Sequence, residues 1–328
     1  MKRRLLAGAC LCALLAGRSA PAAEDPLETA LAASAQSGKP VLLEIVDVKA
    51  MGRRAPAAPE TDPKAKELLD SFYVVRVERD ASADIVKRFG ADLGQSYLPN
   101  PTRVYLDAKG TEIDRGIHPA SPGALAAELQ EVLASGGRLR QMAEAIAKAP
   151  DDPAPRIVRI RYAKKVLRQD LIRLDGKSLV ERLDPAKPEQ QADWGEAAIE
   201  YGWAEATGGD KGAAQRVLSR YLELFPEGPR APDALYQIAN QHRFARKDPA
   251  KAADYFHRLI VLDPGNALCG NARRFFRDNP DQAKRFPPED LGLDLVPADK
   301  VYAWVEPDKA FADAALHKKW VFLYAYWP

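Results

Sequence analysis

The sequence predicts two folded parts of different class, an α/β sandwich followed by an all-α domain. Between about residues 26 and 134, helical and strand-like segments alternate, whereas from about 138 to 285 the apolar residues recur only at helical spacing. The stretch LASGGRLRQ separates the two patterns. With 328 residues, the chain is long enough for about two domains. We therefore expect a layered α/β structure first and a helical array second.

The first residues are typical of an export signal. The basic stretch KRR precedes a short apolar run, residues 5–16, and small residues follow up to a predicted cleavage site near Ala23. The apolar run is too short to span a bilayer. The residue three positions before Cys10 is Ala7, where a lipid-attachment motif has leucine. We expect residues 1–23 to be a signal peptide and the mature protein to lie in the bacterial periplasm, without a lipid anchor or a membrane span.

Charge and cysteine content argue against several classes of function. Cleavage would remove four of the 48 basic residues and none of the 46 acidic ones. The near-neutral chain that remains gives no electrostatic footprint for nucleic acid. Cleavage would also remove Cys10 and Cys12 and leave only Cys269. An exported protein often uses disulfides, but this mature chain could not form one internally.

A helix, a buried strand and a loop open the α/β part. Leu27, Ala30, Leu31 and Ala35 share one helical face, which ends at SGKP. The segment VLLEIV, residues 41–46, is a short apolar run of the kind that a buried strand needs. Residues 52–63, GRRAPAAPETDP, carry three prolines and few large apolar groups, so they predict a loop.

The rest of the α/β part continues the alternation. KAKELLDSF predicts a helix, YVVRVERD a strand and SADIVKRFG another helix. TRVYLD and TEIDRGI indicate two strands joined by a tight turn, in which Gly110 adopts positive φ at little cost. Ser121 and Pro122 begin a last helix and Gly136 ends it. Its apolar face consists of Leu125, Leu129, Val132 and Leu133.

Together these segments resemble the thioredoxin-like fold, especially its exported members. The resemblance covers residues 24–136 and is carried by GKPVLLEIV, LLDSFYVVRVERD, ADIVKRFG and YLPNPTRVYLDAKGTEI. In that family a cis-proline followed by threonine stands beside the active-site cysteines. The resemblance places this feature at Asn100, Pro101 and Thr102. It also implies a groove beside Pro101 in which redox-active relatives hold an extended peptide.

One departure from the family removes its redox chemistry. Redox-active members carry Cys-x-x-Cys at the start of the helix after the first strand, where the helix dipole lowers the thiol pKa. The corresponding loop here consists of Ala50, Met51, Gly52, Arg53 and Arg54. Without a thiolate no group can attack a disulfide, and without a second thiol no mixed disulfide can be resolved. We therefore expect no catalytic residue in this loop; its two arginines are either solvated or contact an anion or a partner.

Glu44 falls where the family often has a buried acid that transfers protons to and from the cysteines. With no thiol to serve, we favour a structural or solvated role for this side chain. Cys269, in ALCGNARRF, is interpreted as a small buried hydrophobe on a helix. The alternative is a reactive thiol flanked by Arg273 and Arg274.

Two segments within residues 137–285 resemble tetratricopeptide repeats. In YGWAEATGGDKGAAQRVLSRYLELFP, the small, small, large and proline positions of that motif fall on Gly202, Ala214, Leu218 and Pro226. In ALYQIANQHRFARKDPAKAADYFHRLIVLDP, the second half of the motif recurs at Ala252, Phe256, Leu259 and Pro264. Small residues let two antiparallel helices approach, a large residue fills the gap and proline ends the pair. Residues 151–170 and 189–203 would add one or two irregular repeats.

Residues 286–328 fit neither part. DKVYAWVEP and KKWVFLYAYWP are aromatic and β-branched, which favours short strands that pair as a hairpin or cap the helical array. The four histidines, His118, His242, His257 and His317, have no metal-ligand spacing. The sequence also has no phosphate loop, nucleophile elbow or dinucleotide-binding turn. We therefore expect neither a metal nor a cofactor.

These observations lead to one preferred hypothesis and two alternatives. The preferred one is a non-catalytic interaction protein of the cell envelope, in which a redox-inactive thioredoxin-like domain and a repeat array bind a protein or peptide. The first alternative is a thiol–disulfide oxidoreductase, or an accessory of such a system, that uses Cys269 or a partner's thiol. That alternative is inferred from the fold alone. The second alternative is a structural scaffold within a larger assembly.

Overall fold

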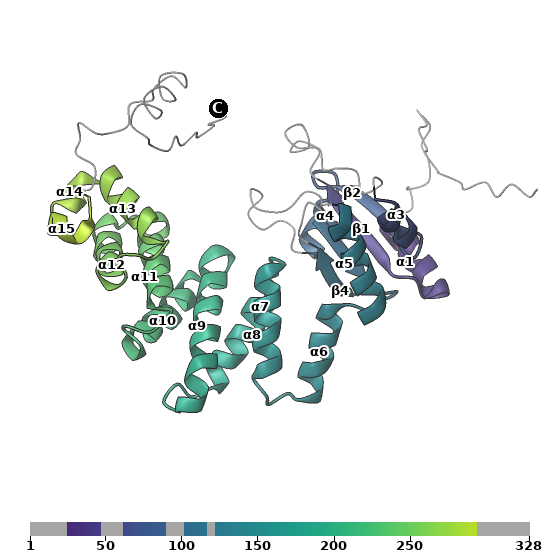
Figure 1. The fold of residues 1–328 in the computed structure, drawn as a ribbon, viewed down its shortest axis with the longest axis horizontal. Helices are drawn as coiled ribbons and strands as arrows, with labels where there is room; N and C mark the ends of the chain where they lie inside the picture. The colour runs from purple at the N-terminus through teal and green to yellow at the C-terminus, as the bar shows by residue number, and fades with distance from the viewer. Residues whose placement is uncertain (1–24, 47–61, 90–101, 117–121, 294–328) are drawn as a thin grey trace, which may run out of the picture. The chain divides into compact units, whose positions relative to one another are not determined.

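The computed structural model describes residues 25–46, 62–89, 102–116 and 122–293. The chain divides into two compact units. The first runs to Pro150 and includes residues 165–167, and the second comprises residues 151–164 and those from 168 onward. The first unit contains a four-stranded sheet with helices, and the described part of the second unit is helical (Figure 1). This agrees with the expected order of an α/β part and an all-α part. No helix in the described ranges is long and apolar enough to cross a membrane.

The first unit begins with α1 (Pro26–Ser37) and β1 (Val41–Val46). The Asp25 side chain caps α1 by accepting a hydrogen bond from the backbone of Leu27. The other elements are α3 (Pro63–Leu69), β2 (Tyr73–Glu78), α4 (Ala83–Arg88), β3 (Thr102–Leu106), β4 (Glu112–Gly116), α5 (Pro122–Ser135) and α6 (Arg138–Lys148). All of these except α6 correspond to helices and strands predicted from the sequence.

The sheet has the strand order β2-β1-β3-β4. β1 pairs parallel with β2 and antiparallel with β3, and β3 pairs antiparallel with β4. The turn between β3 and β4 is the predicted one: Gly110 has φ 71°, and the Asp107 carboxylate accepts hydrogen bonds from the backbone of Lys109 and Thr111. Glu44 on the central strand β1 lies between Arg76 on β2 and Arg103 on β3 in the register.

Alternating side chains give the sheet two separate cores. Leu43 and Ile45 point to the face covered by α1 and α4, together with Val104. Leu42 points to the opposite face, where it packs with Tyr105 and with residues of α3 and α5. Because strand side chains alternate, Glu44 belongs to the α3/α5 face. Figure 1 shows these helices around the sheet.

Helix α6 belongs to the first unit, so the domain boundary predicted at residue 136 falls inside that unit. The backbone N–H and guanidinium of Arg138 donate to the buried carboxylate of Asp114 on β4, at 3.2 and 3.0 Å. Gly137 has φ 98° and lies so close to Ile113 that a Cβ atom would stand 2.3 Å from its carbonyl oxygen. Only glycine fits both restrictions, and this close approach fixes α6 against β4.

The second unit consists of successive helices, many of which pack on the next one along the chain (Figure 1). They are α7 (Ala154–Lys165), α8 (Gln169–Arg182), α9 (Pro188–Gly208), α10 (Lys211–Leu224), α11 (Ala231–Asn240), the π-helical segment η2 (Gln241–Ala245), α12 (Pro249–Leu262), α13 (Cys269–Asp278), α14 (Pro280–Ala283) and α15 (Pro288–Leu291).

The residues at the proposed repeat positions lie where helices meet or end. Ala214, Leu218, Ala252, Phe256 and Leu259 are buried. Leu218 on α10 packs directly against Gly202 on α9. Pro226 and Pro264 are exposed, each two residues beyond the last residue of α10 and of α12.

The described beginning of the C-terminal segment is helical. Leu291 in α15 is buried in the main core of the second unit, which also contains Phe256, Phe275 and Phe276. On α12, the His257 Nε2 atom lies 3.1 Å from an Asp290 carboxylate oxygen, and the His257 ring stacks on Phe286. The two aromatic segments predicted as strands, residues 299–307 and 318–328, lie outside the described residues.

Candidate functional site

The residues predicted around the thioredoxin-like loop are only partly described. Ala50, Met51, Gly52, Arg53 and Arg54 lie outside the described residues, as do Asn100 and Pro101. Thr102 is described, as the first residue of β3, and is buried. Glu44 is the other described member of the predicted site.

Glu44 is held by two arginines on the sheet. Its side chain is 3% exposed, and its Oε2 atom accepts hydrogen bonds from Nη2 and Nε of Arg76 at 2.7 and 3.1 Å. Its Oε1 atom accepts from Nε of Arg103, also 3% exposed, at 3.3 Å. Both carboxylate oxygens are therefore engaged by guanidinium groups of the neighbouring strands. This arrangement favours the structural role expected for Glu44.

A second carboxyl group on the same face, that of Glu128, has a tyrosine as its hydrogen-bond partner. The Tyr105 hydroxyl on β3 donates to the Glu128 carboxylate on α5. Burial raises the pKa of Glu128, although the hydrogen bond from Tyr105 and the charge of Arg103 act in the opposite direction. Burial and the neighbouring Glu128 charge raise the pKa of Tyr105. The hydrogen bond between Tyr105 and Glu128 therefore joins α5 to the sheet.

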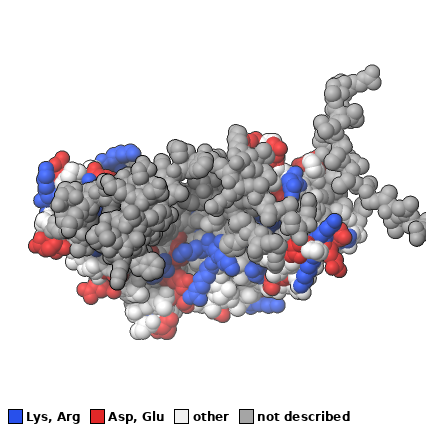
Figure 2. Space-filling view, turned by 45° about the horizontal axis from the view of Figure 1, so that its top comes forward, with Lys and Arg blue, Asp and Glu red and all other residues white. Residues whose placement is uncertain are grey.

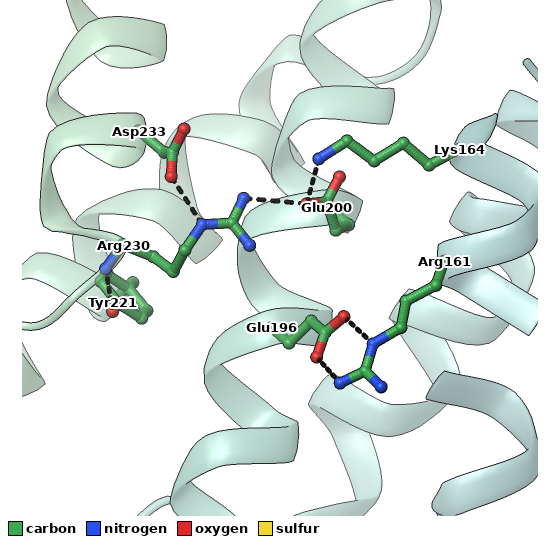
Figure 3. A network of polar contacts seen from close by, with 7 residues as sticks. All are labelled: Arg161, Lys164, Glu196, Glu200, Tyr221, Arg230 and Asp233. Atoms are coloured by element: carbon green, nitrogen blue, oxygen red, sulfur yellow. Dashed lines mark hydrogen bonds and ion pairs between the residues drawn. The ribbon is translucent and has the colours of Figure 1, made fainter. Parts of the chain in front are cut away.

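The most extensive polar site lies in the second unit, on one side of α7 and α9. Arg161 donates to both carboxylate oxygens of Glu196, at 2.7 and 2.6 Å (Figure 3). One helical turn further on, Lys164 donates to Glu200 at 2.7 Å. Both contacts advance in the same direction along the two helices, so α7 and α9 run parallel and present these side chains on adjoining faces.

The network continues from α9 to α11 (Figure 3). Nη2 of Arg230 donates to Glu200 at 2.8 Å, and its Nε donates to Asp233 at 2.5 Å. The backbone N–H of Arg230 donates to the hydroxyl of Tyr221 at 3.2 Å. Burial lowers the pKa of Arg230, but its bonds to Asp233 and Glu200 outweigh burial and raise the pKa overall. Arg230 thus neutralises two carboxylates and holds the start of α11 against α9.

Aromatic and amide groups extend the same surface to α13. The Trp203 ring on α9 stacks on Tyr236 of α11, with centroids 6.3 Å apart. The Asn271 side chain on α13 donates to the Tyr236 hydroxyl at 3.2 Å. We call these three groups of contacts together the inter-helix ladder. Its members are Arg161, Lys164, Glu196, Glu200, Trp203, Arg230, Asp233, Tyr236 and Asn271.

The ladder ends beside a hollow of about 220 Å³ between α11, η2, α12 and α13. Tyr236, Asn240, Arg243, Phe244, Phe256, Asn271, Arg274 and Asp278 line it. Phe244 is 58% exposed. The Arg243 guanidinium lies over the rings of Phe244 and Phe275, at 4.7 and 5.4 Å from their centroids. The hollow therefore combines cationic, amide and aromatic groups.

The π-helical segment η2 forms one wall of this hollow. Its register is wider than that of an α-helix, because the N–H of Arg246 bonds to the carbonyl of Gln241. Gln241 and His242 are buried, and both amide atoms of Gln241 and Nδ1 of His242 have no hydrogen-bond partner among the described residues. Lys247 then adopts φ 55°. π-Helical turns inside α-helices often occur at functional sites.

Cys269 and the described histidines do not form a reactive cluster. Cys269 is fully buried at the start of α13, and its Sγ donates to the carbonyl of Asp263 at 3.1 Å. Burial raises the pKa of this thiol, which opposes formation of a thiolate. Within the described residues no group of three or more His, Cys, Asp or Glu side chains could hold a metal. His118 and His317 lie outside those residues.

Charged side chains of both signs occur on the face of the described residues seen in Figure 2. Figure 2 shows acidic and basic side chains interspersed with uncharged ones on the visible described surface. Local pairs, not a one-sided patch, therefore dominate the electrostatics of that face, as the near-neutral composition predicts.

The sequence pattern indicated Glu44 as a candidate buried acid but did not indicate the ladder or the hollow. A signal for the ladder was present, because pairs of opposite charge stand 35 and 36 residues apart, from Arg161 to Glu196 and from Lys164 to Glu200. Comparison with known proteins adds no identity: no protein-family model and no curated protein matches this chain.

Proposed function

We propose that the protein is a non-catalytic, partner-binding protein of the cell envelope. It is exported by its N-terminal signal, and it combines a redox-inactive thioredoxin-like domain with a tetratricopeptide-like array. The partner is a protein or peptide that binds along the inter-helix ladder. The observation that carries this proposal is the ladder itself, a series of polar and aromatic contacts on four helices. It ends in a hollow lined by Arg243, which has no ion pair among the described residues.

The layers of the first unit support the thioredoxin-like assignment. A central strand with one parallel and one antiparallel neighbour, a β3–β4 hairpin and a closing helix α5 follow the order that the resemblance implies. Helices cover both faces of the sheet. Glu44 forms ion pairs with two arginines. This supports a structural role for the carboxylate and argues against a role in proton transfer.

The spacing of the ladder contacts supports tandem repeats. The hydrogen bonds from Arg161 to Glu196, Lys164 to Glu200 and Asn271 to Tyr236 join residues 35, 36 and 35 positions apart. A tetratricopeptide repeat has about 34 residues. Equivalent positions of successive helix pairs would therefore touch, as expected when each repeat contacts only its neighbours. These contacts also favour inclusion of α7 and α8 as an upstream repeat.

The alternative function in thiol–disulfide exchange has only the fold resemblance behind it. Cys269, the one cysteine that would remain after signal cleavage, is buried in the helical unit. Its raised pKa and its hydrogen bond to Asp263 make it a poor nucleophile. The described residues thus favour binding over redox catalysis.

Site-specific photocrosslinking in living cells would test the proposal. A photoreactive amino acid is placed at Val158, one turn before Arg161 on α7, or at Phe244 beside the hollow. The matched control is Leu174 on α8, which is 61% exposed but is not in the ladder. We expect the first two positions to give a discrete adduct with one protein and Leu174 to give none. Equal labelling from all three positions, or no adduct from Val158 and Phe244, would contradict the proposal.

A further inference from the structure

We infer that the hollow between α11, η2, α12 and α13 binds a peptide segment in which a single carboxylate adjoins a large apolar side chain. This inference rests on the proposed partner-binding function and names the chemistry that the partner presents at one site. It depends on three features of the hollow: an arginine that pairs with no carboxylate in the described ranges, neighbouring neutral hydrogen-bonding groups, and an exposed aromatic ring.

Arg243 is the expected partner of the carboxylate. Among the described residues it has no ion pair, whereas Arg230, at the start of α11, contacts two carboxylates. Its guanidinium is instead placed over the rings of Phe244 and Phe275. Stacking on an aromatic face leaves the N–H groups at the edge of the guanidinium plane free to donate. Such an edge matches the two oxygens of a carboxylate.

Neutral groups around Arg243 would orient the bound segment. Tyr236 accepts a hydrogen bond from Asn271, so its own hydroxyl hydrogen remains available for a ligand oxygen. Asn240, one turn along α11, adds an amide with both donors and an acceptor. Arg274 and Asp278 form a loose ion pair, with 4.0 Å between Nε and the carboxylate oxygen, and both side chains are exposed. Because Asp278 also lines the hollow, one carboxylate is favoured over a run of acidic residues.

The apolar part of the ligand would cover aromatic surface. Phe256 is 1% exposed and forms part of the lining, whereas Phe244 is 58% exposed. An aliphatic or aromatic side chain next to the carboxylate would remove the exposed Phe244 ring from water. A carboxylate bound to Arg243 would then lie in a drier environment, where its hydrogen bonds are stronger.

The π-helical turn η2 is an independent reason to assign a binding role to this side of the hollow. An α-helix advances each residue by about 100° around its axis, so a regular register through residues 241–245 would turn Arg243 and Phe244 to other directions. In the wider turn, Gln241 and His242 are buried, and both amide atoms of Gln241 and Nδ1 of His242 have no partner within the described part of the chain. Buried unpaired polar groups are unfavourable and call for an explanation. Presentation of Arg243 and Phe244 to the hollow is that explanation.

Selection from a displayed library of random dodecapeptides on the purified protein would test the inference. We expect enriched sequences to share an Asp or Glu next to Leu, Ile, Phe or Trp. A fluorescent peptide of the enriched sequence should bind Arg243→Ala about tenfold more weakly or worse, and Arg243→Lys with an intermediate loss, because lysine lacks the planar fork. Arg277→Ala, which removes an exposed arginine of α13 outside the hollow, should leave affinity unchanged.

The peptide supplies a test that does not depend on a folded variant. Replacing its acidic residue by the corresponding amide should weaken binding to the unaltered protein, and should have little further effect on Arg243→Ala. Enriched peptides without an acidic residue, affinity insensitive to Arg243→Ala, or no enrichment at all would overturn the inference. A photocrosslinked partner at Val158 but none at Phe244 would retain the proposed function and reject this site.

Discussion

Gly202 on α9 and Leu218 on α10 pack so closely that a Cβ atom at residue 202 would lie 2.6 Å from the Leu218 side chain. Leu218 is fully buried, so it has little room to withdraw. We expect Gly202→Ala to lower the free energy of unfolding by about 1–3 kcal/mol through overpacking. Chemical denaturation of the full chain, followed by circular dichroism, would measure the loss.

Two further variants identify the cause of that loss. Gly270→Ala on α13 adds the same methyl group where nothing lies within 4 Å of the new Cβ, and it should stabilise by up to about 1 kcal/mol because alanine favours helix. Leu218→Ala combined with Gly202→Ala should be less destabilising than the sum of the single changes. Strict additivity of the two losses would show that the contact is not the cause.

Glu44 and Arg103 form a buried ion pair whose disruption should destabilise the first unit. Glu44→Ala removes the carboxylate that the guanidinium of Arg103, 3% exposed, contacts at 3.3 Å, and we expect a loss of about 2–4 kcal/mol. Arg76 is 59% exposed in the same pair system, so Arg76→Ala should cost no more than about 1 kcal/mol. Thermal unfolding of the three proteins would compare them. Equal effects of the two substitutions would show that burial of Arg103 does not set the cost.

The secondary structure of the first unit could be predicted because its local signals agree with its packing. The run VLLEIV is buried along its whole length as β1, and Gly110 adopts the positive φ that the turn requires. The position of α6 could not be predicted in this way. Its attachment depends on Asp114 of β4 and on the close approach of Gly137 to Ile113, contacts that a pattern of local apolar spacing does not contain.

Of the candidate sites, only the one at Glu44 could be predicted from the sequence, because an acidic residue at that position of the fold indicates a role. Glu44 stood out because its place in the fold is associated with an acid, and its two arginine partners follow only from the strand register. The hollow depends on the π-helical turn at Gln241–Ala245, whose sequence is compatible with an ordinary α-helix. Tertiary packing decides that register, so the exposure of Arg243 and Phe244 had no local signal.

His242 should make the second unit less stable in mild acid. Burial, followed by the charges of Arg246 and Lys251, lowers the pKa of His242, and Asp248 only partly opposes them. The unfolded chain binds a proton near pH 6.5, while the folded protein stays neutral at this position to lower pH. The contribution of His242 to the free energy of unfolding is therefore fully present above about pH 6.5. It falls as the pH decreases below that value, by at most about 1.4 kcal/mol per pH unit.

Denaturation at several pH values between 7.5 and 5 would measure this dependence. In His242→Gln the titrating group is absent, so its stability should fall less steeply with decreasing pH than that of the unaltered protein. The comparison uses the difference between the two curves, because other groups titrate equally in both. Parallel curves would show that His242 has the same proton affinity in the folded and unfolded chains.

Cys269 should be unreactive in the folded protein. Its side chain is fully buried, and burial raises its pKa, so an aromatic disulfide reagent should label it slowly at pH 8 and at once in denaturant. The labelling rate should rise with denaturant concentration as unfolding exposes the thiol. Insulin reduction by the purified protein should stay at background. Activity above background that disappears in Cys269→Ser would instead support the thiol–disulfide alternative.

Glu200 and Glu196 lie one turn apart on α9 and should differ in their contributions to stability. Glu200 is 7% exposed and joins Lys164 of α7 to Arg230 before α11, whereas Glu196 is 22% exposed and pairs with Arg161, which is 63% exposed. We expect Glu200→Ala to lower the free energy of unfolding by about 1–3 kcal/mol, because it removes a buried carboxylate shared by two cations. Arg230 keeps its contact with Asp233, so the loss stays below that of a fully unpaired buried charge. Glu196→Ala should cost about 1 kcal/mol or less.

A double-mutant cycle between Glu200 and Arg230 would separate the pair from other effects of substitution. We expect a coupling free energy of about 1–3 kcal/mol from Glu200→Ala and Arg230→Ala. The corresponding cycle for Glu196 and Arg161 should give about 0.5 kcal/mol, and this value should fall further in 0.5 M salt since the pair is exposed. Equal coupling in the two cycles would mean that Glu200 does not hold α7, α9 and α11 together. Packing of their apolar faces alone would then determine how these helices are arranged.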